Sequence, residues 1–285
     1  MAEQKDPYEA NRVLWNERTK KHVGSVFYDV ESFIAGRDPL TAIEHELLGD
    51  VSGEHILHLQ CHFGQDTLAL CRMGAQVTGL DLSDIAIDEA RKLAARCGLK
   101  ADWVLSNVAE HRPGLDGRFD TIFTSFGTIG WLPDLTPWAG NIVRYLKPGG
   151  RLVFVEFHPV VWMWDNDFKH LQYSYFNREP IVEVEQGTYA DKDADIPLPS
   201  HTWNHDLGEV LTALLEAGLR LDRFLESDGS PHDCFANTVK GDDGLFRIEG
   251  MEGKLPMVYG LTATKVQDHR WADTVDTRVL MPVPS

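Results

Sequence analysis

Three polar segments each follow a short apolar run of the kind that forms a buried strand. QCHFGQD at residues 60–66 follows the first run, Asp81 ends the second, and Asn107 follows the third. A glycine such as Gly64 lets a ligand approach the backbone, and a helix beginning behind it presents free N–H groups. A carboxylate can accept both hydroxyls of a ribose, and an amide followed by an apolar residue suits adenine. Together these segments indicate a nucleotide-binding site.

The elements that position these residues alternate between strand and helix patterns. Strands are predicted at 55–60, 76–80, 101–105, 119–125 and 151–157. Helices are predicted at 66–73, at 84–97, and after Thr136, which we expect as the N-cap with Pro137 at the first helical position. This alternation predicts an α/β fold, with a parallel sheet covered on both faces and the carboxyl ends of its strands at one edge.

The alternation stops at residues 159–200, which are rich in aromatic and acidic residues and are predicted to be an insertion after strand five. Within it, EPIVEVEQGTYAD has the pattern of a β-hairpin. Asp206 and Glu209 then have the spacing of a capping box, and LRLDRFLE and PMVYGLTATK predict two more strands. We expect an N-terminal helical lid over 1–50, a nucleotide-binding domain over 51–265 and a C-terminal tail over 266–285.

The motifs resemble those of class I S-adenosylmethionine-dependent methyltransferases of the small-molecule type. VTGLDLSDIAIDEARKLA, FDTIFTSFGTIGWL and NIVRYLKPGGRLVFVE are similar to the second motif, the fourth motif and the turn before strand five. In the first motif His58 replaces the family's acid, Gln60 and His62 replace two glycines, and Gly64 keeps the third. The resemblance covers residues 54–158 by motif and 200–265 by topology. It implies a Rossmann-like, doubly wound, mostly parallel sheet of seven strands in the order 3-2-1-4-5-7-6.

The resemblance also implies S-adenosyl-L-methionine as the cofactor. The residues expected to bind it are Gln60, His62, Gly64, Gln65, Asp66, Asp81, Leu82, Asn107, Val108, Ser125 and Phe126. We expect the side chains of Gln60 and His62 to replace close backbone approach, although His62 could instead pack beneath the N-terminal helices. The role of the missing acid falls to Gln65, Asp66 or an N-terminal residue.

Methyl transfer is an in-line displacement that depends on positioning, and it needs a general base only if the nucleophile enters protonated. Glu156 and His158, at the end of strand five, are the base candidates, although His158-Pro159 could equally be a structural turn. His201 and His205 could close over the cleft, or His205 could pack at a helix entry. The acceptor is expected to contact Trp131, Tyr28, Trp15 and His22. The three N-terminal aromatic residues could instead only fix a helix to the core.

The composition of the chain indicates which kinds of partner are not expected. A net charge of −17 without a Lys/Arg cluster argues against nucleic acid as a partner. The four cysteines are too far apart in sequence for a zinc motif or a disulfide framework, so reduced thiols and no metal are expected. No apolar run approaches the roughly 20 residues that span a bilayer, and the N-terminus is polar. These features predict a soluble, cytoplasmic protein without a membrane partner.

The leading interpretation is an enzyme that methylates O, N or S of a small molecule. Aminopropyl transfer from a related sulfonium would need paired acids after strand four, where Ser125 and Phe126 stand. An NAD-dependent oxidoreductase would need the tighter G-x-G-x-x-G turn. A non-catalytic, regulatory protein that binds S-adenosylmethionine remains an alternative. The acidic insertion hints at a cationic or amine-bearing acceptor.

Overall fold

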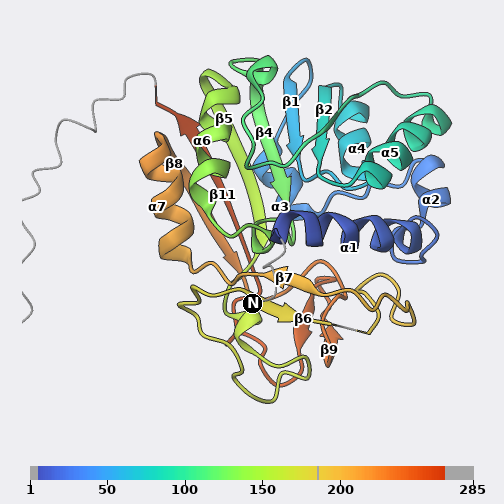
Figure 1. Cartoon of the computed structure of the whole chain (residues 1–285), viewed down its shortest axis with the longest axis vertical. Coiled ribbons are helices and arrows are strands. Elements are labelled where there is room, and N and C mark those ends of the chain that lie inside the picture. Colours follow the sequence, from blue (N-terminus) through green and yellow to red (C-terminus); the bar gives the residue numbers. More distant parts are fainter. Residues whose placement is uncertain (1–5, 185, 267–285) are drawn as a thin grey trace, which may run out of the picture.

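The computed structural model describes residues 6–184 and 186–266 and contains a seven-stranded sheet (Figure 1). Its strands are β1 (His55–Leu59), β2 (Gln76–Asp81), β3 (Asp102–Leu105), β4 (Phe119–Ser125), β5 (Leu146–Phe157), β8 (Leu219–Ser227) and β11 (Val258–Lys265). They lie in the order β3-β2-β1-β4-β5-β11-β8, and β11 is antiparallel to both of its neighbours. This confirms the predicted order, with β8 and β11 as the predicted sixth and seventh strands.

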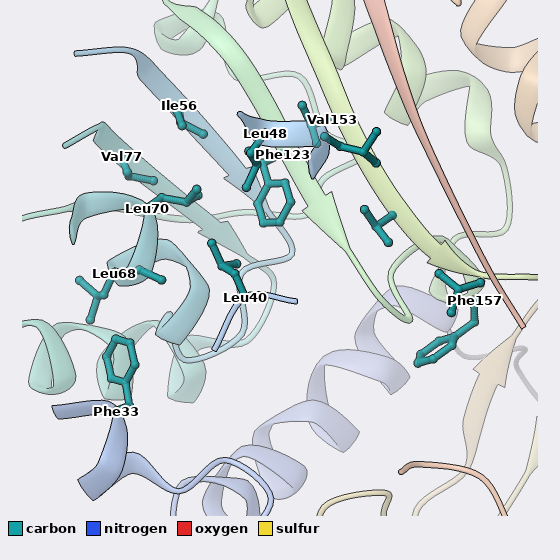
Figure 2. Close-up of a cluster of buried hydrophobic side chains, with 14 of the residues drawn as sticks. Phe33, Leu40, Leu48, Ile56, Leu68, Leu70, Val77, Phe123, Val153 and Phe157 are labelled. Atoms are coloured by element: carbon teal, nitrogen blue, oxygen red, sulfur yellow. The ribbon is translucent and has the colours of Figure 1, made fainter. Parts of the chain in front are cut away.

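Helices cover both faces of the sheet. On one side lie α2 (Val30–Ile34), α3 (Ala42–Leu48), α4 (Gln65–Arg72) and α5 (Asp84–Cys97), and on the other α6 (Leu135–Tyr145) and α7 (Leu207–Ala217). Ile56 and Leu57 are successive residues of β1, yet they enter different hydrophobic clusters because side chains alternate across a strand. Figure 2 shows the first cluster, in which Ile56, Leu68 and Phe123 pack between sheet and helices.

Local capping explains where the helices begin. The Ser83 hydroxyl accepts a hydrogen bond from the Ala86 N–H, 3.0 Å away, and Asp206 caps α7 as predicted. The N-cap of α6, however, is Asp134, whose carboxylate accepts from the Thr136 N–H at 2.8 Å. The expectation that Thr136 is the N-cap is therefore wrong, because the stronger acceptor lies two residues earlier.

Helix α1 (Pro7–His22) crosses the edge where the parallel strands end, and residues 159–184 and 186–204 lie beyond it (Figure 1). The hairpin expected within EPIVEVEQGTYAD is wrong. Among its described residues, that segment contributes only β6 (Ile181–Glu183), which pairs antiparallel with the more distant β7 (Ser200–Thr202). A second small sheet joins β9 (Thr238–Lys240) to β10 (Phe246–Ile248). The domain boundaries stay a prediction, and most of the expected tail, 267–285, lies outside the described residues.

Across the described parts of the chain, every helix is too short or too polar to cross a membrane.

Candidate cofactor and acceptor site

A cavity of about 1150 Å³ lies at the carboxyl ends of the parallel strands, bounded by α1, the insertion and residues 231–236. Every residue predicted to bind the cofactor lines it, from Gln60 in the first loop to Phe126 after β4. Pockets for one small ligand are usually about 300–1,000 Å³. This cavity is therefore large enough for a cofactor together with a second small molecule.

The loop after β1 keeps a glycine-type backbone although it has only one glycine. Gln60, His62 and Gly64 have φ angles of 53°, 49° and 82°, all in the left-handed region. A residue with a side chain pays roughly 1–2 kcal/mol there. Two hydrogen bonds support the loop: His62 N donates to Asp81 Oδ2 at 2.8 Å, and Gln60 Nε2 donates to the Thr128 carbonyl at 2.7 Å. The loop thus has a left-handed backbone at both positions where side chains replace glycine.

The His62 ring packs beneath the N-terminal helices, as in the alternative interpretation. Its centroid is 5.4 Å from that of Trp15 and 5.4 Å from that of Tyr28, and its Nε2 lies 3.3 Å from Thr19 Oγ1. Burial lowers the pKa of His62 well below its usual value, so the ring is neutral. The residue shapes the loop through its backbone and anchors α1 through its ring.

Asp81 stands at the end of β2, where a ribose is expected. Its two oxygens accept from His62 N and Ser83 N at 2.8 Å each, and burial raises its pKa to about 6. Each carboxylate oxygen keeps a second acceptor position. Helix α1 is bonded to this end of the site, since Ser83 Oγ donates to Asn16 Oδ1 at 2.6 Å.

Three ionisable side chains, Glu44, Asp66 and Arg37, lie at the other end of the loop, and only Asp66 of these was predicted. Glu44 of α3 is 2 % exposed, and its carboxylate accepts from Thr41 N at 2.7 Å. Asp66 has its pKa raised to about 7 by burial and by the charge of Glu44. Arg37 Nη2 donates to the Tyr28 carbonyl at 2.5 Å and to Gln65 Oε1 at 3.4 Å. Its Nε is buried and has no hydrogen-bond partner among the described residues.

Sequence reasoning missed Glu44 and Arg37. They belong to no motif, and only the fold brings their segment beside Gln65 and Asp66. The single available signal was the capping-box spacing of Thr41 and Glu44, which indicates a helix start and not a ligand.

The two base candidates have structural partners. The Glu156 carboxylate accepts from the backbone N–H groups of Gly127, Thr128 and Phe157 at 2.5–2.7 Å, which fixes the loop after β4. His158 lies outside the cavity lining, with Nδ1 accepting from Val160 N at 3.2 Å and Nε2 3.1 Å from Glu226. This geometry favours the structural-turn interpretation of His158, and we propose neither residue as a base.

The expected acceptor contacts divide into two groups. Trp131, Trp15 and Tyr28 line the cavity, with the Trp15 and Trp131 centroids 5.2 Å apart. His22 lies behind this wall, fully buried, with Nε2 3.0 Å from Thr188 Oγ1, and burial lowers its pKa to about 3. It therefore stabilises the contact between α1 and the insertion.

His201 and His205, the two histidines expected near the cleft, each join separate segments of the chain. The backbone of His201 pairs with the Asn11 amide of α1 through bonds of 2.8 and 3.0 Å. His205 Nε2 donates to the Leu132 carbonyl at 2.7 Å. Within the described ranges, no group of three His, Cys, Asp or Glu residues has the arrangement of a metal site.

Known proteins with similar sequences are methyltransferases. Residues 56–150 match the family described as a methyltransferase domain. A ubiquinone biosynthesis O-methyltransferase of Shewanella halifaxensis is 28% identical over 109 residues, 38% of this chain and 46% of that protein. A demethylmenaquinone methyltransferase of Tropheryma whipplei is 35% identical over 115 residues, 40% and 46% of the two chains. The chain thus spans about half the length of these curated relatives.

Solved structures share the fold over most of the chain. A putative S-adenosylmethionine-dependent methyltransferase from Listeria monocytogenes has a TM-score of 0.57 at 18% identity, covering 79% of this chain and 98% of its own. A Burkholderia thailandensis 1,6-didemethyltoxoflavin-N1-methyltransferase, solved with S-adenosylhomocysteine, has a TM-score of 0.52 at 17% identity and covers 93% of each chain.

Residues 56–150 thus match a methyltransferase domain, and the sheet has the fold of class I S-adenosylmethionine-dependent methyltransferases. The cavity fits S-adenosylmethionine, the cofactor of this class, because the cavity is lined by the loop after β1 and by the ends of β2, β3 and β4.

Proposed function

We propose that this protein transfers the methyl group of S-adenosylmethionine to an O, N or S atom of a small molecule. The observation that carries the proposal is one continuous cavity that joins the intact first loop to an aromatic compartment under the insertion. When bound, the cofactor supplies a methyl group already activated on a sulfonium. The acceptor's lone pair forms the new bond, the carbon–sulfur electrons return to sulfur, and any proton on the acceptor is released. The protein's task is to hold the reactants in line and exclude water.

The residues that would hold the nucleoside part are those of the β1, β2 and β3 ends. Asp81, with an acceptor position left on each oxygen, suits the ribose hydroxyls. Asn107 and Val108 suit the adenine ring. The α1 lid, held by Asn16 and Ser83, would then cover this part of the ligand.

The charged group suits the amino-acid part of the cofactor. His58, which replaces the family's acid, shares a hydrogen bond with Thr67 at 2.8 Å, and burial lowers its pKa to about 3. A neutral imidazole exerts no charge attraction on an ammonium group. Burial raises the pKa of both Glu44 and Asp66, and an ammonium bound beside them would favour their charged forms and be attracted by them, while the unpaired Nε of Arg37 would donate to the carboxylate.

The acceptor compartment favours a ring-containing molecule. Phe157, Trp162 and Phe235 contact one another with centroids 5.2–5.7 Å apart, and all three line the cavity. Aromatic walls bind planar apolar groups through stacking and edge contacts. The methyltransferases of quinone biosynthesis named above fit this class of acceptor.

The test is release of S-adenosylhomocysteine from S-adenosylmethionine, followed by mass spectrometry, with a panel of aromatic hydroxyl, amine and thiol compounds. We expect release that depends on the acceptor, together with an acceptor product 14 mass units heavier, the mass of the CH₂ that a methyl adds on replacing a hydrogen. A protein that binds the cofactor tightly but releases nothing with any of the three acceptor types would instead be a binding protein.

A further inference from the structure

His232 lies at the junction between the cofactor end of the cavity and the acceptor compartment. Its ring centroid is 4.9 Å from that of Phe126, which follows β4, and 5.8 Å from that of Phe27, which follows α1. Phe126 in turn contacts Phe157 of the acceptor compartment, with centroids 5.2 Å apart. All four residues line the cavity. The His232 ring therefore stands where an acceptor bound against Phe157 would meet the cofactor.

Hydrogen bonds fix the backbone that carries His232. Its N–H donates to Ser230 Oγ at 3.1 Å, and that hydroxyl donates to the His232 carbonyl at 2.8 Å. Ser230 is fully buried, and its own N–H and carbonyl pair with Phe246 of β10 at 2.8 Å each. His232 thus belongs to a supported segment, which is what a group that must meet a reacting atom requires.

The His232 ring has a hydrogen-bonding capacity that residues 6–184 and 186–266 do not use, since neither ring nitrogen has a partner among them. The side chain is only half-buried, so a ligand in the cavity can reach it, unlike His22 Nδ1 and His62 Nδ1, which are buried. Desolvation lowers the pKa of His232 to about 4, so the ring is neutral at neutral pH. A neutral imidazole has one nitrogen with a free lone pair, which can accept a hydrogen bond and then a proton.

Proton transfer to His232 would leave the net charge of the site unchanged. The acceptor's lone pair forms the bond to the methyl carbon, the carbon–sulfur electrons return to sulfur, and the acceptor's proton passes to the ring nitrogen. One positive charge is lost at sulfur and one appears on the imidazolium. The low pKa of the ring reflects the cost of adding a charge to the empty cavity, and this step adds none. Exchange with water after product release returns the ring to its neutral form.

We propose that His232 accepts a hydrogen bond from the hydroxyl of an aromatic acceptor and takes its proton as the methyl group is transferred. This inference rests on the proposed function, because a base is needed only where a methyl group moves to a protonated atom. It assigns the base role that the structural contacts of Glu156 and His158 leave open. An acceptor that arrives without a proton, such as a thiolate, would not need His232.

The first experiment compares methylation of 2-naphthol and 2-naphthalenethiol at about pH 8. The two probes have similar shapes, but the thiol is mostly ionised there and the naphthol is mostly protonated, because aromatic thiols are the stronger acids. His232→Gln keeps a hydrogen-bond acceptor that cannot take a proton. It should reduce methylation of 2-naphthol by about 100-fold or more, the usual contribution of a general base, and methylation of the thiol by less than about threefold. A purely structural role would reduce both alike.

His158→Gln is the matched control. His158 is also a histidine near the cavity, but it lies outside the lining, and its ring nitrogens already contact Val160 N and Glu226. We expect this variant to methylate both probes at wild-type rates. Circular dichroism spectra establish that each variant is folded before rates are compared.

A second experiment needs no turnover. Equilibrium dialysis measures binding of 2-naphthol and naphthalene, which differ by one hydroxyl, with and without S-adenosylhomocysteine. We expect the wild-type protein to prefer 2-naphthol by about tenfold, the effect of one ordinary hydrogen bond. His232→Phe keeps an aromatic ring without a hydrogen-bonding atom. It should reduce the preference below about threefold while naphthalene binds as before.

Equal losses with the two probes in His232→Gln, or an unchanged rate with 2-naphthol, would overturn the base role. A wild-type protein that does not methylate 2-naphthol would also overturn it, but methylation of other acceptors would leave the proposed function standing. No methylation of any acceptor would contradict both. A 2-naphthol preference that is absent in the wild-type protein, or that survives in His232→Phe, would overturn the hydrogen bond itself.

Discussion

Gly64 is the position of the first loop at which both the backbone and a neighbouring side chain require glycine. Its φ is 82°, and a Cβ added there would lie 2.4 Å from Cη2 of Trp103. Gln60 and His62 carry side chains at similar φ because their side chains find partners in Thr128 and in the rings of α1 and its loop. Side chains thus replace glycine at Gln60 and His62, where their contacts offset the backbone strain. Glycine remains at Gly64, where an added Cβ would collide with Trp103.

We expect Gly64→Ala to lower the free energy of unfolding by about 2–4 kcal/mol, since strain at positive φ adds to overpacking against Trp103. Cofactor binding should be lost with it. Gly98→Ala is the control: its φ is 64°, but an added Cβ meets nothing within 4 Å, so it should cost only about 1–2 kcal/mol. Denaturant unfolding of the two variants measures the difference, and equal losses would show that Trp103 does not constrain residue 64.

Glu44 provides the test of the amino-acid clamp. Glu44→Gln keeps an acceptor for Thr41 N but removes the charge, so S-adenosylhomocysteine should bind at least about tenfold more weakly. 5′-Methylthioadenosine, which lacks the amino-acid part, should bind with unchanged affinity. Glu46→Gln, on the exposed side of the same helix, is the control and should bind both ligands like wild type. Equal weakening of the two ligands in Glu44→Gln would remove Glu44 from the clamp.

Among the elements, α1 joins the two halves of the site. It contacts the sheet side through Asn16 and Ser83, and the insertion through the paired bonds between Asn11 and His201. Because α1 is bonded on both sides of the cavity, a ligand that enters past α1 can do so only after the bonds on one side break. The bonds at Asn11 are thus the place to test α1 as a lid.

Asn11→Ala should lower the free energy of unfolding by about 1–3 kcal/mol, because the partly buried backbone groups of His201 lose their partner. S-adenosylhomocysteine should also dissociate faster, which stopped-flow fluorescence measures. Glu9→Ala, exposed on the same helix, should change stability by less than about 0.5 kcal/mol. Unchanged dissociation in a destabilised Asn11 variant would mean that α1 is a fixed wall.

Elements with local signals could be predicted from the sequence. The strands of the sheet and α5 and α7 were predicted because their apolar period and caps, such as Ser83 and Asp206, lie within a few residues. The hairpin in the insertion was mispredicted because β6 finds its partner in β7, beyond a long loop that has no periodic pattern. The N-cap of α6 was misplaced because Asp134 and Thr136 are both good caps, and only the structure shows which one is used.

At the scale of the whole molecule, the site is a junction of segments from the full length of the described chain. The cofactor end could be predicted because motifs place Gln60, Asp81 and Asn107 at neighbouring strand ends. Arg37 and Glu44 could not be predicted as site residues, because only tertiary packing brings them into the cavity beside Gln65 and Asp66.

The central claim is that the QCHFG loop still forms a working S-adenosylmethionine site. Calorimetric titration of the purified protein with S-adenosylmethionine, S-adenosylhomocysteine and NAD tests it most directly. We predict micromolar binding of both sulfur ligands and no binding of NAD. Binding of NAD alone, or of none of the three, would contradict the claim and leave only the fold in common with the methyltransferases.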